Sequence, residues 1–401
     1  MSGHRARRRA DRRAARRRAA RRGAMVAAAS VVVAVGAAAG TLSALRGDGR
    51  ADEARPAVTA SPRLEALPVP PPLPPSATPS APAAPATPSP SGRPAPSAPS
   101  RPAPDSTRQR SAATASGLYR HPRSQVLDWV RAHPDDPRRA VIASRIGDHP
   151  AAVWFADPSP ATVTARVREV TSGAAAEGRV PVVVPYAIPG RDCGGHSGGG
   201  APDLAAYDGW IDRFAAGLGS GEVIVILEPD SVSQAECLTE GERGARFASL
   251  ARAGRVLKAA APGARVYYDA GHSGWHAPAR QAGWLRQAGA GAAASSDGVF
   301  SNVSNFHATA DEIAYDRAVL DALGGPPDLG AVVDTSRNGN GAPPGGQWCD
   351  PGGRTLGRAP TLATGERGID AYLWVKLPGE SDGCEGPPGT FSPSYAYDLA
   401  R

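Results

Sequence analysis

Short runs of apolar residues recur along the last two thirds of the chain, separated by polar stretches. Most are rich in β-branched residues and too short for helices, so they predict buried strands. They occupy residues 152–155, 180–186, 223–230, 265–271, 298–305, 331–337 and 371–379. Between them, residues 204–218 and 241–261 have helical periodicity. This alternation predicts an α/β fold with a parallel sheet, and seven such strands favour a barrel over an open sheet.

The beginning of the chain has a different pattern. Residues 1–23 are rich in arginine, and the following residues 24–45 carry no charge. The uncharged stretch is long enough to span a bilayer as a membrane anchor, with the arginines on the cytoplasmic side, and a cleaved signal peptide fits equally well. Both interpretations place the rest of the chain outside the cell, either secreted or tethered to the outer face of the membrane.

Residues 46–116 consist mainly of Pro, Ala and Ser, with almost no large apolar side chain. Such a segment cannot bury a core, so it predicts a disordered linker. The folded domain is therefore expected over residues 117–401, a length ordinary for an α/β barrel.

The positive charge belongs to the tail rather than to this domain. The whole chain has a formal charge of +7, but residues 116–401 carry 26 basic and 32 acidic residues. An acidic domain argues against nucleic-acid binding, which needs a basic surface on the folded part. No glycine-rich nucleotide-binding motif follows any predicted strand, so no nucleotide cofactor is expected.

The number of cysteines is consistent with the predicted export of the domain. An even count in an oxidising compartment favours two disulfides over free thiols. Zinc coordination is the alternative, but the chain contains no CxxC pair. The four residues are Cys193, Cys237, Cys349 and Cys384.

Polar residues follow the predicted strands at their exits, and in a parallel barrel all exits lie on one face. Four of these residues are aspartates: Asp192, Asp230, Asp269 and Asp382. Each alone is more often a turn residue or a helix cap. Crowded into one cleft, they cannot all stay ionised, so at least one pKa should rise. A protonated acid beside an ionised carboxylate is the arrangement that glycoside hydrolysis uses.

Aromatic side chains near the same exits fit a carbohydrate site. Flat rings stack against sugar faces, although core packing is the alternative for each ring. The rings are Trp154, Tyr186, Trp275 and Trp348. Polar side chains nearby have the chemistry to bind sugar hydroxyls, namely His272, Asn305, Lys376 and Glu380.

Six motifs in this part of the chain resemble glycoside hydrolase family 6, the cellulases and cellobiohydrolases that act on β-1,4-glucan. They are "YAIPGRDCGG", "ILEPDS", "YYDAGHSGW", "NVSNF", "QWCDPGGRTLG" and "LWVKLPGESDGC", in the family's order. The resemblance covers residues 117–401. It implies a distorted seven-stranded parallel barrel and hydrolysis with inversion at the anomeric carbon, without a metal or other cofactor.

The resemblance also implies roles for individual residues. Asp230 matches the general acid, and Asp192 matches the acid that tunes its pKa and helps to activate water. Asp382 matches the residue proposed as base, and Asp269 matches a supporting acid. Tyr186 matches the ring beneath the distorted sugar. The sugar-binding positions matched are Trp154, His272, Trp275, Asn305, Trp348, Lys376 and Glu380, and the implied disulfides are Cys193–Cys237 and Cys349–Cys384.

Loop length bears on the mode of attack. Chain-end members of the family roof the cleft with two long loops, whereas the segments after Asp192 and Asp382 are short in this sequence. We therefore expect an open cleft and internal cleavage by a monomeric endo-1,4-β-glucanase. The alternatives are a chain-end cellobiohydrolase and a catalytically silent carbohydrate-binding wall protein. No cellulose-binding module accompanies the linker, which favours soluble or amorphous glucan as the substrate.

Overall fold

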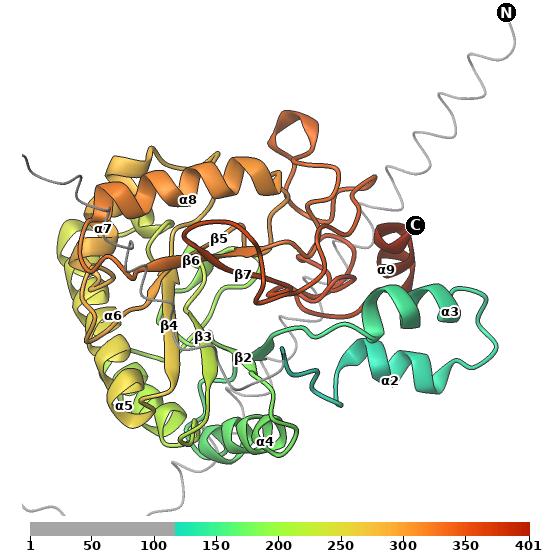
Figure 1. The fold of residues 1–401 in the computed structure, drawn as a ribbon, viewed down its shortest axis with the longest axis horizontal. Coiled ribbons are helices and arrows are strands. Elements are labelled where there is room, and N and C mark those ends of the chain that lie inside the picture. Colours follow the sequence, from blue (N-terminus) through green and yellow to red (C-terminus); the bar gives the residue numbers. More distant parts are fainter. Residues whose placement is uncertain (1–116) are drawn as a thin grey trace, which may run out of the picture. The chain divides into compact units, whose positions relative to one another are not determined.

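Seven parallel strands follow one another around the sheet in chain order (Figure 1). The computed structural model describes residues 117–401. All seven predicted strands are confirmed. Their bounds are β1 Val153–Phe155, β2 Val182–Pro185, β3 Val223–Leu227, β4 Ala264–Asp269, β5 Gly298–Ser301, β6 Gly330–Asp334 and β7 Ile369–Leu373.

The strands alternate their side chains between two apolar layers. In β3, Ile224 and Ile226 point to the interior of the curled sheet, where they pack with Tyr267 and Phe300. Val225 belongs to the second layer, between the sheet and the surrounding helices. Both faces of the sheet are therefore buried, which explains why its strands read as continuous apolar runs.

The barrel is open at one seam. Within residues 117–401, β1 and β7 each pair with one neighbouring strand only. Just outside the strands, the amide of Ala152 donates a hydrogen bond to the carbonyl of Trp374 at 2.9 Å. The indole of Trp154 donates to the carbonyl of Val375 at 2.7 Å. A backbone bond and a side-chain bond thus join the start and middle of β1 to the segment that directly follows β7.

Helices cover the outside of the sheet (Figure 1). The predicted helices at 204–218 and 241–261 are confirmed as α5 and α6, and Thr239 and Glu242 form a capping box at the start of α6. The outer helices are α4 Val163–Ala176, α5 Leu204–Ala215, α6 Glu240–Ala260, α7 Pro278–Gln287 and α8 Thr309–Leu323.

A small helical unit stands beside the seam. Here α2 (Gln125–Ala132) and α3 (Arg139–Ile142) pack with the C-terminal α9 (Pro393–Ala400). Val126, Ile142 and Ala396 share one apolar cluster with Trp374 and Leu377, which follow β7. The unit therefore holds the chain just beyond β7, where several predicted site residues lie.

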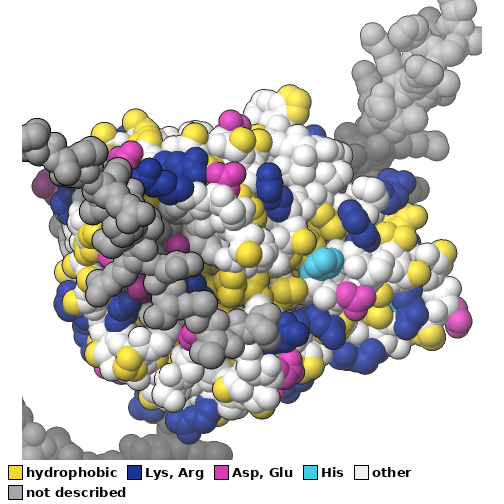
Figure 2. Space-filling view, in the orientation of Figure 1, with side chains coloured by type: hydrophobic (Ala, Val, Ile, Leu, Met, Phe, Trp, Pro, Cys, Tyr) yellow, Lys and Arg dark blue, Asp and Glu magenta, His cyan; other side chains and the backbone are white. Residues whose placement is uncertain are grey.

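The predicted arginine-rich region, anchor or signal peptide, and linker fall in residues 1–116, outside the described residues. Among residues 117–401, no helix has the length and apolar character needed to cross a membrane. On the face that Figure 2 shows, basic and acidic side chains are interspersed. That distribution differs from the single-sign surface of a nucleic-acid-binding protein.

Candidate active site

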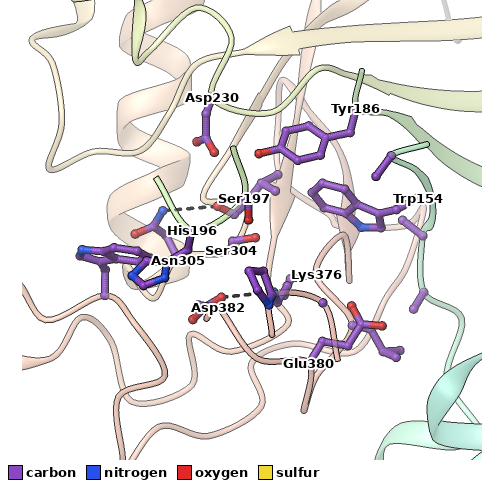
Figure 3. Close-up of a pocket in the computed structure, with 18 of the residues that line it drawn as sticks. Trp154, Tyr186, His196, Ser197, Asp230, Ser304, Asn305, Lys376, Glu380 and Asp382 are labelled. Atoms are coloured by element: carbon purple, nitrogen blue, oxygen red, sulfur yellow. Dashed lines mark hydrogen bonds and ion pairs between the residues drawn. The ribbon is translucent and has the colours of Figure 1, made fainter. Parts of the chain in front are cut away.

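A cleft of about 1050 Å³ opens at the carboxyl ends of the strands (Figure 3). It brings together residues from all parts of the domain, including eleven of the twelve predicted catalytic and sugar-binding residues. Asp269 is the exception, because it is buried behind the wall that carries Asp230. The eleven that line the cleft are Trp154, Tyr186, Asp192, Asp230, His272, Trp275, Asn305, Trp348, Lys376, Glu380 and Asp382.

Asp230 reaches the cleft on a tight turn at the end of β3. The backbone φ is 48° at Glu228 and 69° at Asp230, so two non-glycine residues adopt the left-handed conformation around Pro229. Such conformations cost energy and persist only where the surroundings fix them. The turn ends the strand and aims the Asp230 carboxyl into the cleft.

Asp269, at the end of β4, fixes the chain just after that turn. Its Oδ2 accepts hydrogen bonds from the amides of Val232 at 3.1 Å and Ser233 at 2.8 Å, and its Oδ1 accepts one from Gly271 at 2.9 Å. Burial raises the pKa of Asp269, and these amide donors oppose the rise. Asp269 therefore positions the turn that carries Asp230.

The surroundings of Asp230 favour its protonated form. Burial raises the pKa of Asp230 well above its ordinary value, and the charges of Asp269 and Asp192 raise it further. No cation among the described residues forms an ion pair with Asp230 to oppose this. A carboxylic acid kept protonated near neutral pH is able to donate a proton to a leaving group.

Glu228 has a structural position next to this acid. Its side chain is fully buried and accepts hydrogen bonds from the amides of Ala187 and Ile188, which follow β2. Burial raises the pKa of Glu228 to about 7, against the pull of these donors. Glu228 thereby ties the exit of β3 to the exit of β2.

Asp192 lies on the loop that follows β2. Its Oδ2 accepts a hydrogen bond from the amide of Ser197 at 2.7 Å, and its Oδ1 accepts one from the side-chain amide of Gln234 at 3.2 Å. The adjacent Cys193 forms a disulfide with Cys237, as predicted. The loop of Asp192 is therefore fastened to the segment that follows Asp230.

Two aromatic rings form the floor between these elements. Tyr186 and Trp154 meet edge to face with their centroids 5.1 Å apart. The guanidinium of Arg191 lies over the Tyr186 ring at 4.6 Å. Burial and the nearby Asp230 and Asp192 raise the pKa of Tyr186, so its hydroxyl stays protonated and remains a hydrogen-bond donor beside Asp230.

Asp382 lies on the opposite side of the cleft from Asp230, next to Lys376 (Figure 3). Its Oδ2 lies 2.8 Å from Nη1 of the fully buried Arg337, and its Oδ1 lies 3.2 Å from Nζ of Lys376. Its Oδ2 also accepts a hydrogen bond from the amide of Asp350 at 3.1 Å. The Asp382 carboxylate is therefore held between two cations.

Asp350 stabilises the loop that carries Asp382 through several hydrogen bonds. Its carboxylate accepts hydrogen bonds from the Ser381 hydroxyl and from the amides of Asp382, Cys384 and Glu385. Burial alone would raise the pKa of Asp350, but these donors outweigh it and lower the pKa to about 2. The predicted disulfide Cys349–Cys384 is present and closes the same loop.

Arg337, Asp350 and Asp334 were not singled out from the sequence. Asp334 is the last residue of β6, Arg337 follows it in the segment "DTSRNGNG", and Asp350 falls in "QWCDPGG". The buried Asp334 accepts a hydrogen bond from the amide of Lys376 at 3.0 Å and thereby holds the start of the Lys376 loop. An arginine immediately beyond an apolar strand was the available signal.

The remaining predicted residues also line the cleft. His272 stacks on His307 with centroids 4.2 Å apart and lies 5.1 Å from the Trp275 ring. Burial lowers the pKa of His272 to about 3, so the imidazole is neutral and suited to hydrogen bonding with hydroxyls. Trp348 is half exposed, an orientation that leaves its ring open to a ligand.

Glu380 is held by the helical unit. Its Oε1 accepts a hydrogen bond from the side-chain amide of Gln125 on α2 at 3.0 Å. Burial raises the pKa of Glu380 to about 7, with Lys376 opposing the rise. Asn305 also lies at the wall of the cleft, where it follows β5.

Potential metal ligands in the described part of the chain have other partners. The cluster of His196, Cys349 and Cys384 contains two cysteines that are joined in a disulfide and are not available as thiolate ligands. His276 is buried and its Nε2 hydrogen-bonds to the carbonyl of Ser233. These residues do not form a metal site.

Comparisons with known proteins find a matching family and similar sequences. The sequence profile of the glycosyl hydrolases family 6 matches residues 110–395. The chain is 54% identical to "Endoglucanase 1" of Streptomyces sp. (strain KSM-9), and the alignment covers 72% of this chain and 79% of that protein. It is 48% identical to "Endoglucanase A" of Thermobispora bispora, over 71% of this chain and 62% of that protein.

A solved structure extends the similarity to the fold. The endoglucanase Cel6 of Mycobacterium tuberculosis, in complex with methyl-cellobiosyl-4-deoxy-4-thio-β-D-cellobioside, superposes with a TM-score of 0.66 at 39% identity. The match covers 72% of this chain and 98% of that structure.

Proposed function

Because the chain belongs to glycosyl hydrolase family 6, we propose that it is an exported endo-1,4-β-glucanase that cleaves internal bonds of β-1,4-glucan with inversion. The observation that carries the proposal is the unequal electrostatics of the two sides of the cleft. Asp230 is a protonated acid without a cation, whereas Asp382 is paired with Arg337 and Lys376.

In this mechanism, the glucan chain lies in the cleft with one sugar over Tyr186. Asp230 donates its proton to the glycosidic oxygen as the bond to the anomeric carbon breaks. A water molecule attacks that carbon from the opposite face and inverts its configuration, and its proton passes towards Asp192 and Asp382. Asp269 holds the Asp230 turn, and the charges of Asp192 and Asp269 keep Asp230 protonated until the substrate arrives.

Sugar binding is assigned to the side chains that line the rest of the cleft. Trp154, Trp275 and Trp348 offer ring faces, and His272, Asn305, Lys376 and Glu380 offer donors and acceptors for hydroxyls. The neutral imidazole of His272 fits this assignment because it adds no charge next to an uncharged sugar.

The internal mode of cleavage is supported by the loops and by the relatives. Residues 193–203 and 383–392 are the segments that link Asp192 to α5 and Asp382 to α9, and both are short. The relatives at 54% and 48% identity are named endoglucanases. The two disulfides support export, since disulfides persist in oxidising compartments.

The test is hydrolysis of carboxymethyl cellulose, in which both the viscosity of the solution and the number of new reducing ends are measured over time. A rapid fall in viscosity with few new reducing ends is the expected result. Release of reducing ends with little loss of viscosity would instead identify a chain-end cellobiohydrolase. Binding of cello-oligosaccharides without any hydrolysis would identify a carbohydrate-binding protein and refute the proposed enzyme.

A further inference from the structure

Two buried carboxylates on α8 lie behind the cleft. Glu312 and Asp316 are both fully buried and stand one helical turn apart, so they share one face of the helix. Burial and the charge of Glu312 raise the pKa of Asp316, and no cation of residues 117–401 forms an ion pair with either carboxylate. Two carboxylates in this setting cannot both ionise without a large free-energy cost.

The hydrogen bonds of the pair leave one oxygen on each side chain without a partner. Glu312 Oε1 accepts from the amide of Ser273 at 2.9 Å, and Asp316 Oδ2 accepts from the hydroxyl of Ser301 at 2.9 Å. Glu312 Oε2 and Asp316 Oδ1 are buried and unpartnered in the described part of the chain. A proton on one of these oxygens removes one of the two buried charges.

The pair is connected directly to a wall of the cleft. Ser273 lies between His272 and Trp275, which both line the cleft. One residue before Asp316, the hydroxyl of Tyr315 donates to the carbonyl of Ala270 at 3.0 Å, at the start of the same loop. Two hydrogen bonds thus join the first half of α8 to the loop of residues 270–276.

The charged groups on the neighbouring elements do not neutralise the pair. Within the described residues, Arg317 on α8 pairs with Glu366, and Arg280 on α7 pairs with Glu236. Arg286 on α7 donates to the carbonyl of Ala322. The other acidic and histidine side chains on the packed elements are Asp269 at the end of β4, His272 and His276 in the loop, His307 before α8, Asp311 and Asp321 in α8, and Asp334 at the end of β6.

We propose that Glu312 is a positioning residue for the loop of His272 and Trp275, and that a proton shared between Glu312 and Asp316 makes this positioning depend on pH. The inference rests on the proposed function, because that function assigns the loop to sugar binding. Below the pH at which the pair loses its shared proton, the loop is held in the sugar-binding position. Above it, two unpaired charges are buried between α8 and the loop, which destabilises their packing and weakens sugar binding.

The direction of the pH dependence follows from the linkage between proton binding and folding. Burial raises the pKa of both Glu312 and Asp316, so the folded protein holds protons that the unfolded chain releases at ordinary carboxyl pKa values of about 4. The stability supplied by these protons is complete below about pH 4 and is lost as the pH rises through the raised values. Sugar binding through the loop weakens in the same direction.

Glu312→Gln tests the proposal most sharply. Glutamine keeps a carbonyl acceptor for the Ser273 amide and offers a permanent donor to Asp316, so it reproduces the singly protonated pair at every pH. We expect the ratio of wild-type KM to variant KM for cellohexaose to rise about threefold or more between pH 6 and pH 9, as for loss of one hydrogen bond. Glu312→Ala should raise KM at all pH values and change kcat less.

The matched control is Glu366→Gln, which removes an exposed acid that pairs with the same helix. Its KM should follow the wild type at every pH. A constant KM ratio for Glu312→Gln across the pH range would overturn the proposal.

Thermal unfolding without substrate separates this inference from the proposed function. The melting temperature of Glu312→Gln relative to wild type should rise with pH, whether or not the protein hydrolyses glucan. Asp316→Asn should change in the same sense. A difference in melting temperature that does not vary with pH would refute the shared proton even if glucan hydrolysis is confirmed.

Discussion

The two sides of the cleft carry the same residue type in opposite electrostatic settings. Asp230 lies near two further carboxylates and has no ion pair with a cation of the described domain. Asp382 touches two cations, Arg337 and Lys376. The fold therefore raises the pKa of one aspartate and pairs the other with two cations through their neighbours alone. A single cleft can then hold an acid and an anion at the same pH.

The two sides are also fastened in parallel ways. Cys193–Cys237 closes the loop of Asp192, and Cys349–Cys384 closes the loop that carries Asp382. Since each side is fixed independently, a substitution on one side should leave the geometry of the other intact. The comparison can therefore be tested one side at a time.

The largest effect is expected from Asp230→Asn, which removes the protonated acid. General acid catalysis contributes about 10²–10⁴-fold, so kcat on carboxymethyl cellulose should fall to that extent. An aryl cellobioside with a leaving group that needs no protonation should lose far less. Equal losses on both substrates would show that Asp230 does not donate the proton. Asp212→Asn, on the exposed face of α5, serves as the control.

On the opposite side, Arg337→Met should be the most destabilising single change. It leaves the buried Asp382 with one cation, and breaking a buried ion pair costs about 3–5 kcal/mol. Guanidinium unfolding measures this loss. Arg317→Met breaks an exposed pair with Glu366 and should cost less than about 1 kcal/mol. Similar losses for the two variants would mean that the Arg337 pair contributes no more than a surface pair.

The strands and the main helices could be predicted because their signals are local. β3 is a run of five β-branched or leucine residues, and α6 begins with a Thr and Glu capping pair. Parallel strands that exit on one face then place their following residues together, whatever the details of packing. The gathering of Asp192, Asp230 and Asp382 around one cleft follows from that topology.

The neighbours that set the charge of each aspartate could not be predicted in the same way. Arg337 and Asp382 are 45 residues apart in the chain and meet only through the packing of two loops. Asp350 acts through four donors on a loop whose shape depends on a disulfide. Such contacts have no periodicity in the sequence.

A smaller effect is expected from Asp350→Asn. The folded pKa of about 2 lies below the ordinary value, so this group stabilises the protein above about pH 4, and the contribution is lost as the pH falls towards 2. The expected cost is about 2 kcal/mol at pH 7. Unfolding at pH 7, 4 and 2.5 measures it, and the gap to wild type should narrow at pH 2.5. A constant gap would mean that the carboxylate charge is not what stabilises the loop.

The smallest shift is expected from Asp192→Asn, and it concerns pH rather than stability. The charge of Asp192 raises the pKa of Asp230, so removing it lowers that pKa. Because the proposed mechanism needs Asp230 protonated, the fall of kcat/KM at alkaline pH should begin at a lower pH, by about one unit for a neighbouring charge.

The matched comparison is Asp350→Asn, which removes a charge of the same type on the side of Asp382. It should leave the alkaline limb in place, because Asp350 is not among the charges that raise the pKa of Asp230. If both substitutions moved the alkaline limb of kcat/KM equally, charges on either side of the cleft would act equally on Asp230. The pKa of Asp230 would then not be controlled by the residues on its own side. A shift with Asp192→Asn alone would show that each side controls its own aspartate.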